Sequence, residues 1–518
     1  MPNHAYRFHR ILMLFMIVAM LFIAACRPDP HSMAALHATQ TSQSTTGLQD
    51  TATDTPTPTE TPTPTAPLEP TETPMPRAMP VYVPIIANEF RAQASLLGVA
   101  MEGYANSMGL QQALDLYVHF VRRWQPLAWR DVEALEGQYD WSKLAGLESE
   151  LATARAVGIQ PVITIQFTPA WAQKVPNYAC GPIRQDKFEA FATFMEQVVQ
   201  RYGSNSPYRV RYWELGNEPD LAPEEGLFDN IFGCWGDYND PGFGGGYYAE
   251  MLKVVYPRIK AADPNAQVMM PGLIIECNPY IADPCTNERR RKSGYFLQGV
   301  MDAGGGDYFD IIDVHSYAEL RLDLPAKMHS QYAWSGPLGG TGLPEKVAFV
   351  RQVLAQKGYN KPLFVGEVAL KCYEPTAECF DAAAAFVPRV YAEAYQLGAV
   401  GQVYYLLMTD VVHYALLKSD LTPRPMYESY KVLSNNLQSS RFERSVTDYP
   451  GVSGSEFNQN GTRLFQIVWS TDGTDQTIPA PANFIQATDK FGKPIEPVNG
   501  QLTIGWSPIY IDLQLAAQ

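Results

Sequence analysis

The chain has 518 residues, a formal net charge of −15 at pH 7 and a pI near 5.1. This acidic balance argues against nucleic acid or an anionic membrane surface as a ligand, because both are polyanions. Neutral carbohydrate is compatible with it. The length exceeds one small domain and the 46% hydrophobic content is typical of a globular protein, so two or three segments are expected.

Residues 1–25 have the pattern of an export signal. Basic residues near position 10 precede an apolar run from Ile11 to Ala25, which is shorter than the roughly 20 residues that span a bilayer. The run ends in Ile23-Ala24-Ala25-Cys26, which resembles the lipobox of bacterial lipoproteins. The resemblance implies a lipid on Cys26 that anchors the chain outside the cytoplasmic membrane. A plain secretory signal with a chance cysteine is the alternative.

Residues 26–88 are dominated by Thr, Pro, Ser and Ala. Such a segment cannot bury enough apolar surface to offset its ordering entropy, and its prolines favour an extended form. The sequence therefore predicts a disordered spacer that holds the remaining residues away from the membrane.

Six further cysteines follow the spacer: Cys180, Cys234, Cys277, Cys285, Cys372 and Cys379. An even number in an exported chain suggests disulfides, whose pairing the sequence leaves open. The close pairs Cys277/Cys285 and Cys372/Cys379 could each staple a loop. A zinc site competes with this interpretation, but no Cys-x-x-Cys or His-x-x-x-His spacing occurs, and no metal or other cofactor is predicted.

Residues 89–437 alternate short apolar runs with amphipathic helices. The predicted strands are Ser95–Ala100, Val118–Trp124, Pro161–Gln166, Val210–Leu215, Gln267–Met270, Ile311–Val314, Pro362–Val365 and Val403–Leu407. Helices are predicted over Asp140–Val157 and Asp186–Tyr202, among others. Eight alternations indicate an α/β fold of the (β/α)8 TIM-barrel type. A doubly wound open sheet is the alternative, although no Gly-x-Gly-x-x-Gly follows a first strand.

Residues 438–518 lose the helical periodicity. Arg463–Trp469, Phe484–Ala487 and Leu502–Ile504 are separated by turn-forming pairs such as Asp472-Gly473 and Asn499-Gly500. This pattern predicts a small C-terminal antiparallel β-sandwich domain.

Two glutamates follow predicted barrel strands. Glu218 ends the fourth, in Trp213-Glu214-Leu215-Gly216-Asn217-Glu218-Pro219, and Glu367 ends the seventh, after Val365-Gly366. Catalytic residues of α/β barrels sit at such strand ends. Retaining glycoside hydrolysis needs two carboxyl groups roughly 5–5.5 Å apart, one to protonate the leaving oxygen and one to attack the anomeric carbon.

These motifs, together with His315-Ser316-Tyr317 after strand six, resemble the large clan of retaining glycoside hydrolases with catalytic glutamates on strands four and seven. The strongest likeness is to the branch of β-xylosidases and α-L-iduronidases. Members of that branch often carry a C-terminal β-sandwich as well.

The resemblance implies a role for each matching residue. Glu218 would be the acid/base and Glu367 the nucleophile. Asn217 would bind the sugar 2-hydroxyl, and His315 and Tyr317 would line the pocket, with Tyr317 hydrogen-bonded to Glu367. Arg123 matches the arginine that keeps the nucleophile ionised. Its alternative is an ion pair with a nearby acid such as Glu133.

Aromatic residues near strand ends are candidates for stacking on sugar rings. They are Trp124, Trp129, Phe167, Trp171, Trp235, Tyr238 and Trp334, and Trp171 is predicted to bind substrate. The clan usually places a Trp at the end of strand eight, where this chain has Tyr404-Tyr405-Leu406. Tyr405 is therefore predicted as the substrate-binding residue there, and sugar identity is the least determined property.

The sequence thus predicts a membrane-anchored retaining glycoside hydrolase that acts on an oligo- or polysaccharide. The alternative is a non-catalytic carbohydrate-binding lipoprotein on a barrel scaffold. Two opposed carboxylates argue against it, because a pure binder has no need of them.

Overall fold

The computed structural model describes residues 95–103, 109–222, 233–281, 287–331 and 334–515. The predicted signal at 1–25, the lipid-bearing Cys26 and the spacer at 26–88 lie outside these residues. Within them, no helix is long and apolar enough to cross a bilayer.

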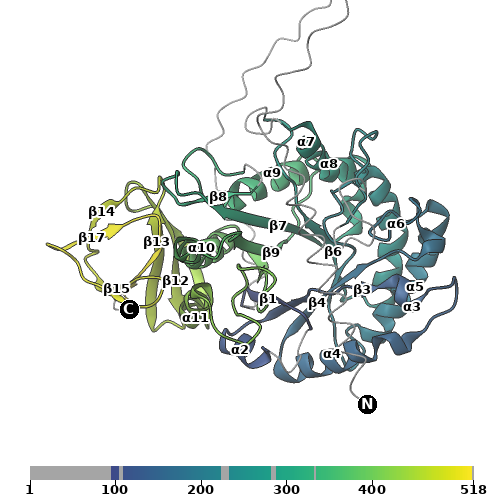
Figure 1. Ribbon diagram of the computed structural model, residues 1–518, viewed down its shortest axis with the longest axis horizontal. Coiled ribbons are helices and arrows are strands. Elements are labelled where there is room, and N and C mark those ends of the chain that lie inside the picture. Colours follow the sequence, from purple (N-terminus) through teal and green to yellow (C-terminus); the bar gives the residue numbers. More distant parts are fainter. Residues whose placement is uncertain (1–94, 104–108, 223–232, 282–286, 332–333, 516–518) are drawn as a thin grey trace, which may run out of the picture. The chain divides into compact units, whose positions relative to one another are not determined.

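Eight parallel strands form a closed barrel in the described part of the chain (Figure 1). They are β1 (Leu97–Met101), β2 (Phe120–Arg123), β4 (Gln160–Gln166), β5 (Tyr212–Glu214), β6 (Gln267–Leu273), β7 (Ile311–Leu320), β9 (Leu363–Lys371) and β10 (Ala399–Tyr404). Each pairs with its neighbour in chain order, and the pairing of β10 with β1 closes the circle. The predicted (β/α)8 barrel is confirmed.

Helices alternate with these strands and cover the barrel (Figure 1). The α-helices are α2 (Leu110–Asp115), α3 (Trp129–Val132), α4 (Ala145–Val157), α5 (Phe188–Tyr202), α6 (Gly245–Ala262), α7 (Glu288–Ser293), α8 (Tyr295–Asp302), α9 (Leu343–Ala355), α10 (Ala377–Gln396) and α11 (Pro425–Leu437). Short strands β3 (Leu127–Ala128) and β8 (Met328–Ser330) lie at strand ends, and β8 pairs antiparallel with β7. The helices predicted over Asp140–Val157 and Asp186–Tyr202 correspond to α4 and α5.

One predicted strand is displaced along the sequence. Residues 403–407 were expected to form the eighth strand, but β10 spans Ala399–Tyr404. Two of its first three residues, Ala399 and Gly401, are of types that are depleted in strands.

The barrel interior is filled in layers because alternate residues of a strand face the same side. Phe120, Tyr212 and Phe364 meet in the lowest layer, with ring centroids 5.3–5.4 Å apart. Arg122 follows Phe120 on the inward face of β2 and begins a charged layer above the rings. Val121 and Arg123 belong to the outward face.

The C-terminal residues form antiparallel sheets, as predicted (Figure 1). One sheet has the order β11 (Ser440–Val446), β12 (Val452–Gln459), β13 (Arg463–Ser470), β18 (Ile509–Leu513), β15 (Phe484–Thr488), β16 (Pro494–Ile495), and the other pairs β14 (Gln476–Pro479) with β17 (Gln501–Ile504). Phe465, Ile467 and Trp469 of β13 join the barrel's core, whereas Val468 joins a separate core with β14 and β17. The central strands β13 and β18 of the larger sheet therefore bury residues on both faces.

Two disulfides join described cysteines. Cys372 and Cys379 pair across a short loop, as the sequence suggested, and Cys180 pairs with Cys234. Cys277 is also disulfide-bonded, and Cys285, its expected partner, lies outside the described residues.

Candidate active site

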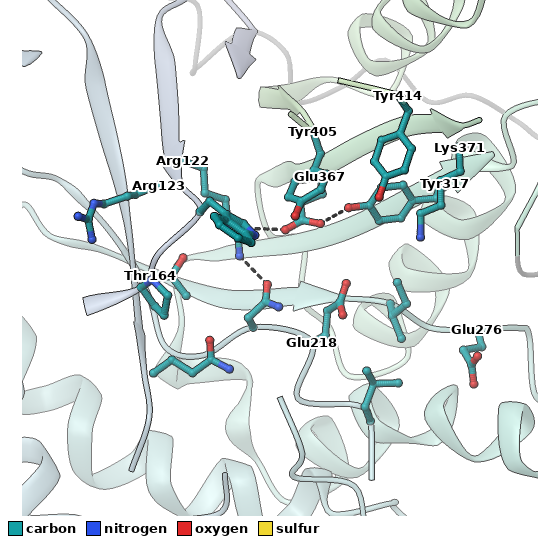
Figure 2. Close-up of a pocket in the computed structure, with 16 residues that line it drawn as sticks. Arg122, Arg123, Thr164, Glu218, Glu276, Tyr317, Glu367, Lys371, Tyr405 and Tyr414 are labelled. Carbon is teal, nitrogen blue, oxygen red and sulfur yellow. Dashed lines mark hydrogen bonds and ion pairs between the residues drawn. The ribbon is translucent and has the colours of Figure 1, made fainter. Parts of the chain in front are cut away.

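A cavity of about 380 Å³ opens at the carboxyl ends of the barrel strands (Figure 2). It is lined by Arg122, Arg123, Trp124, Pro126, Thr164, Gln166, Asn217, Glu218, Leu221, Ile274, Glu276, Tyr317, Glu367, Lys371, Tyr405 and Tyr414. Of the predicted site residues, Asn217, Glu218, Tyr317, Glu367, Arg123 and Tyr405 are in this set.

Glu218 and Glu367 face each other across the cavity, as the sequence predicted (Figure 2). One carboxylate oxygen of each, together with a ring nitrogen of His315, lie within 4.8 Å of one another. Their exposed fractions are only 4% and 7%. The two carboxyl groups are therefore close enough to act on one bond.

The chain around Glu218 adopts a shape that its glycine permits. Gly216 has φ of 122°, a conformation open to glycine but rarely to other residues, and it redirects the backbone after β5. Glu218 then has φ of 46°, and its N–H donates to the carbonyl of Gly272, 3.1 Å away. These features place Asn217 and Glu218 at the mouth of the barrel.

His315 contacts both glutamates from β7. Its Nδ1 lies 2.8 Å from Glu218 Oε1 and 3.6 Å from Glu367 Oε2. The ring packs on Gly272, where a Cβ would come within 2.0 Å of Nε2. A residue larger than glycine at position 272 would therefore displace the imidazole. His315 is fully buried and is not among the residues that line the cavity, so its predicted place in the pocket lining is not confirmed.

Arg122 is the cation that contacts Glu367. Its guanidinium donates to Glu367 Oε1 at 2.6 Å, to Glu214 Oε2 at 2.9 Å and to Asn217 Oδ1 at 2.6 Å. The hydrogen-bonded ion pairs with Glu214 and Glu367 stabilise the positive charge of Arg122 in the barrel interior. The arginine thereby links the predicted nucleophile to the asparagine predicted to bind sugar.

The prediction that Arg123 contacts Glu367 is wrong. Its guanidinium pairs with Glu150 of α4 at 3.0 Å, and not with Glu133. The reason is strand alternation, which turns Arg122 into the barrel and Arg123 toward the surrounding helices. Arg123 still lines the edge of the cavity, so its role in substrate binding stays a prediction.

Below the cavity, Glu214 fixes the positions of several groups. It accepts from Arg122, from Thr164 Oγ1 at 2.5 Å and from the N–H of Gly272 at 3.0 Å. These bonds make Glu214 a fully buried structural partner of the cavity residues.

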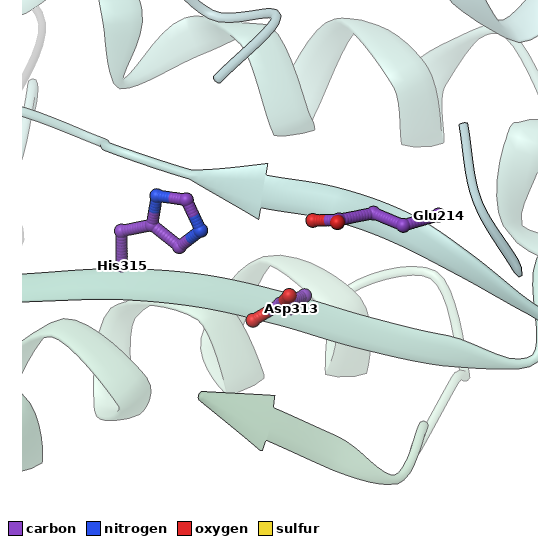
Figure 3. Close-up of side chains that lie close together, drawn as sticks. All are labelled: Glu214, Asp313 and His315. Atoms are coloured by element: carbon purple, nitrogen blue, oxygen red, sulfur yellow. The ribbon is translucent and has the colours of Figure 1, made fainter. Parts of the chain in front are cut away.

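Within the described residues, two clusters of side chains could be considered as metal sites. Glu214, Asp313 and His315 form one (Figure 3), and Glu218, His315 and Glu367 form the other. Arg122 already pairs with Glu214 and Glu367, and burial raises the pKa of Asp313 well above its ordinary value. Because each cluster contains a carboxylate that is bonded to this guanidinium, both fit a metal cation poorly.

Two tyrosines flank the predicted nucleophile. Tyr317 donates its hydroxyl to Glu367 Oε2, as predicted (Figure 2). Tyr405 lines the cavity at the end of β10, and its ring packs edge-on against Tyr317 with centroids 6.2 Å apart. The peptide between Tyr405 and Leu406 is cis.

Burial favours the protonated form of Glu218. Desolvation raises the pKa of Glu218 to about 7, although the charges of Lys371, Arg122 and Lys346 act against it. Burial also lowers the pKa of His315 to about 4, so this imidazole is neutral at neutral pH. Glu218 is thus able to hold a proton near pH 7, as a general acid must.

Trp171 does not line the cavity. Its indole N–H donates to the carbonyl of Glu133 at 3.1 Å, and its ring packs edge-on against Trp129. The predicted contact of Trp171 with substrate therefore has no support in this cavity. Of the seven residues proposed from the sequence to stack on sugar rings, only Trp124 lines this cavity, within the described residues.

The sequence reasoning missed several cavity residues, among them Arg122, Lys371 and Tyr414. Arg122 carried a signal in the alternation Phe120, Arg122, Trp124 on the inward face of β2. Lys371 carried one in its spacing of four residues from Glu367 on the same strand. Tyr414 follows the last barrel strand in an irregular segment with no such signal.

Comparison with protein-family models and with curated proteins found no match. Solved structures with a similar fold include a family 39 glycoside hydrolase from Bacteroides cellulosilyticus WH2, with a TM-score of 0.60 and 21% identity over 81% of each chain. A monomeric β-xylosidase from Caulobacter crescentus CB15 has a TM-score of 0.51 and 17% identity over 82% of this chain and 97% of its own. A glucosidase from Croceicoccus marinus has a TM-score of 0.51 and 14% identity over 81% and 96%. At these identities the likeness establishes the fold.

Proposed function

We propose that this protein is a retaining glycoside hydrolase with Glu367 as nucleophile and Glu218 as acid/base. The observation that carries the proposal is the approach of the two carboxylates to within 4.8 Å. This spacing suits direct attack by a carboxylate, whereas inverting enzymes keep their carboxyl groups roughly 6.5–9.5 Å apart to admit a water. The similar fold of several solved glycoside hydrolases supports it.

The first half of the reaction forms a covalent intermediate. Glu367 attacks the anomeric carbon, the bond to the leaving oxygen breaks, and Glu218 gives its proton to that oxygen. Arg122 and Tyr317 hold the attacking carboxylate through hydrogen bonds to its two oxygens. The product of this step is a glycosyl ester on Glu367 and a free leaving group.

The second half returns the enzyme to its initial state. Glu218, now a carboxylate, takes a proton from water while the water oxygen attacks the anomeric carbon and the ester bond to Glu367 breaks. Two inversions give net retention. Asn217, placed by its bond to Arg122, would bind the 2-hydroxyl of the sugar that is cleaved.

The decisive experiment is a panel of nitrophenyl glycosides with the anomer of the first sugar product followed by NMR. Retention of configuration is the expected result, and release of the inverted anomer would contradict the mechanism. Sugar binding with no turnover over a broad panel would instead favour a non-catalytic carbohydrate-binding protein.

We also propose that the chain is a lipoprotein anchored through Cys26. The support is the apolar run that ends in Ile23-Ala24-Ala25-Cys26. In an expressing bacterium the Cys26→Ser variant should lose incorporation of labelled fatty acid and leave the membrane fraction. Equal membrane association of the variant and the wild type would contradict lipid anchoring.

A further inference from the structure

Strands β7 and β9 extend beyond His315 and Glu367 and stay paired with each other. In their register His315 lies opposite Glu367, and four residues further on Glu319 lies opposite Lys371. Antiparallel β8 pairs with the end of β7. Because alternate residues of a strand share a face, Lys371 projects on the same side as Glu367. The extension therefore places a lysine above the nucleophile.

Lys371 reaches into the cavity (Figure 2). Its ammonium lies 4.0 Å from the ring centroid of Tyr317, whose hydroxyl is bonded to Glu367. Among the described residues, no carboxylate lies within ion-pair distance of this ammonium. The two arginines that line the cavity do have carboxylate partners. Arg122 pairs with Glu214 and Glu367, and Arg123 pairs with Glu150.

The surroundings of Lys371 suit a negative ligand at short range. Burial lowers the pKa of its ammonium, while the charges of Glu218, Glu367 and Glu319 act to raise it. A partly desolvated ammonium gains more from a carboxylate than an exposed one does, because little water is left to displace. The protein's net charge of −15 repels an acidic ligand over long range. At physiological ionic strength, however, salt screens charges that are more than about 8 Å apart.

The position of Lys371 indicates which part of the substrate it meets. In Figure 2, Glu218 and Glu367 lie between Arg122 and Lys371. Under the proposed function, Asn217 holds the cleaved sugar at the Arg122 end, where it is bonded to that arginine. The opposite end is then left for the leaving group.

We propose that Lys371 binds a carboxylate on the leaving-group side of the substrate, so that the enzyme prefers acidic glycosides. The inference rests on the proposed hydrolase function. Lys371 thereby selects the class of substrate, although it takes no part in the bond-breaking steps.

The test compares two leaving groups of nearly equal shape. The glycone is the sugar whose nitrophenyl glycoside the wild type hydrolyses fastest, and it is joined to 3-carboxyphenyl or 3-carbamoylphenyl. At pH 6 and about 0.15 M ionic strength, where salt screens repulsion by the net charge, we expect kcat/KM of the wild type to favour the carboxylate by about tenfold or more. Lys371→Met should bring the ratio toward one, and Lys371→Arg should keep a preference.

The control is Lys357→Met, which changes the net charge equally. Lys357 lies after α9 and pairs with Asp302, and this variant should keep the wild-type ratio. A wild-type ratio of one or below would overturn the inference even if Lys371→Met does not fold, and so would a ratio that survives in that variant. Failure to hydrolyse any glycoside of the panel would refute the proposed function itself, and the inference with it.

Discussion

The barrel mouth and the C-terminal sheets use the same strand alternation for opposite purposes. Inward-facing residues at the mouth are ionisable and buried: Arg122, Glu214, Asp313, His315 and Glu367. The core between the C-terminal sheets is aliphatic, with Val468, Ile478, Leu502, Ile504 and Ile511. Burying charges costs free energy unless each is paired. Burial at the mouth is therefore unfavourable for its charged groups, and the same burial raises the pKa of Glu218 to about 7.

The contrast predicts that substitutions at the mouth abolish activity while substitutions in the C-terminal sheets alter stability. Glu367→Ala should lower kcat by about 10⁴-fold or more, because it removes the attacking group. Glu456→Ala is the matched control, since Glu456 is a similarly buried glutamate of β12. Steady-state kinetics on the best aryl glycoside measure both. Equal activity of Glu367→Ala and the wild type would remove the mouth's assigned role.

Glu218→Gln should lower kcat/KM by about 10²–10⁴-fold on substrates with poor leaving groups. The loss should be much smaller for dinitrophenyl glycosides, whose leaving group needs no proton during glycosylation. The measurement is a series of aryl glycosides of graded leaving-group pKa. A uniform loss across the series would contradict the acid role of Glu218.

The raised pKa of Glu218 predicts the alkaline limit of activity. As pH rises above about 7 the acid loses its proton, and kcat/KM of the wild type should fall about tenfold per pH unit. Asp220 and Lys346 also have pKa values of about 7, so the assignment needs a variant. The limb should disappear in Glu218→Gln, and its persistence there would assign it to another group.

Neighbouring arginines give the sharpest test of buried charge. Arg122→Met leaves Glu214 and Glu367 without their cation and should lower the free energy of unfolding by about 3–5 kcal/mol. Arg123→Met removes a pair nearer the surface and should cost about 1 kcal/mol or less. Urea denaturation of both variants measures the difference. Similar losses of unfolding free energy would mean that the buried ion pairs of Arg122 contribute no more to stability than the pair of Arg123 with Glu150.

The smallest expected effect on function lies in the C-terminal sheets. Ile511→Ala should lower the free energy of unfolding by about 2–5 kcal/mol through a cavity in the aliphatic core, with kcat of the folded enzyme unchanged. Ile485 is 58% exposed, and Ile485→Ala should change stability by less than about 0.5 kcal/mol. A fall in kcat for Ile511→Ala would show that the sheets influence the mouth.

Local patterns in the sequence were enough to predict the barrel. Each strand contains a short apolar run, and this signal needs no distant contact. The same reasoning located Glu218 and Glu367, because each follows the apolar run of a barrel strand, although β9 continues beyond Glu367 to Lys371. The loop disulfide between Cys372 and Cys379 was equally local.

Only the tertiary structure decided which side chains meet. Arg122 and Arg123 differ by one position on a four-residue strand, and the register of that strand in the barrel selects the one that contacts Glu367. Trp171 packs on Trp129 rather than in the cavity, and Cys180 joins Cys234 from a distant segment. Periodicity along a chain specifies elements and their ends, whereas partners across the barrel depend on closure, register and packing, which no single stretch of sequence contains.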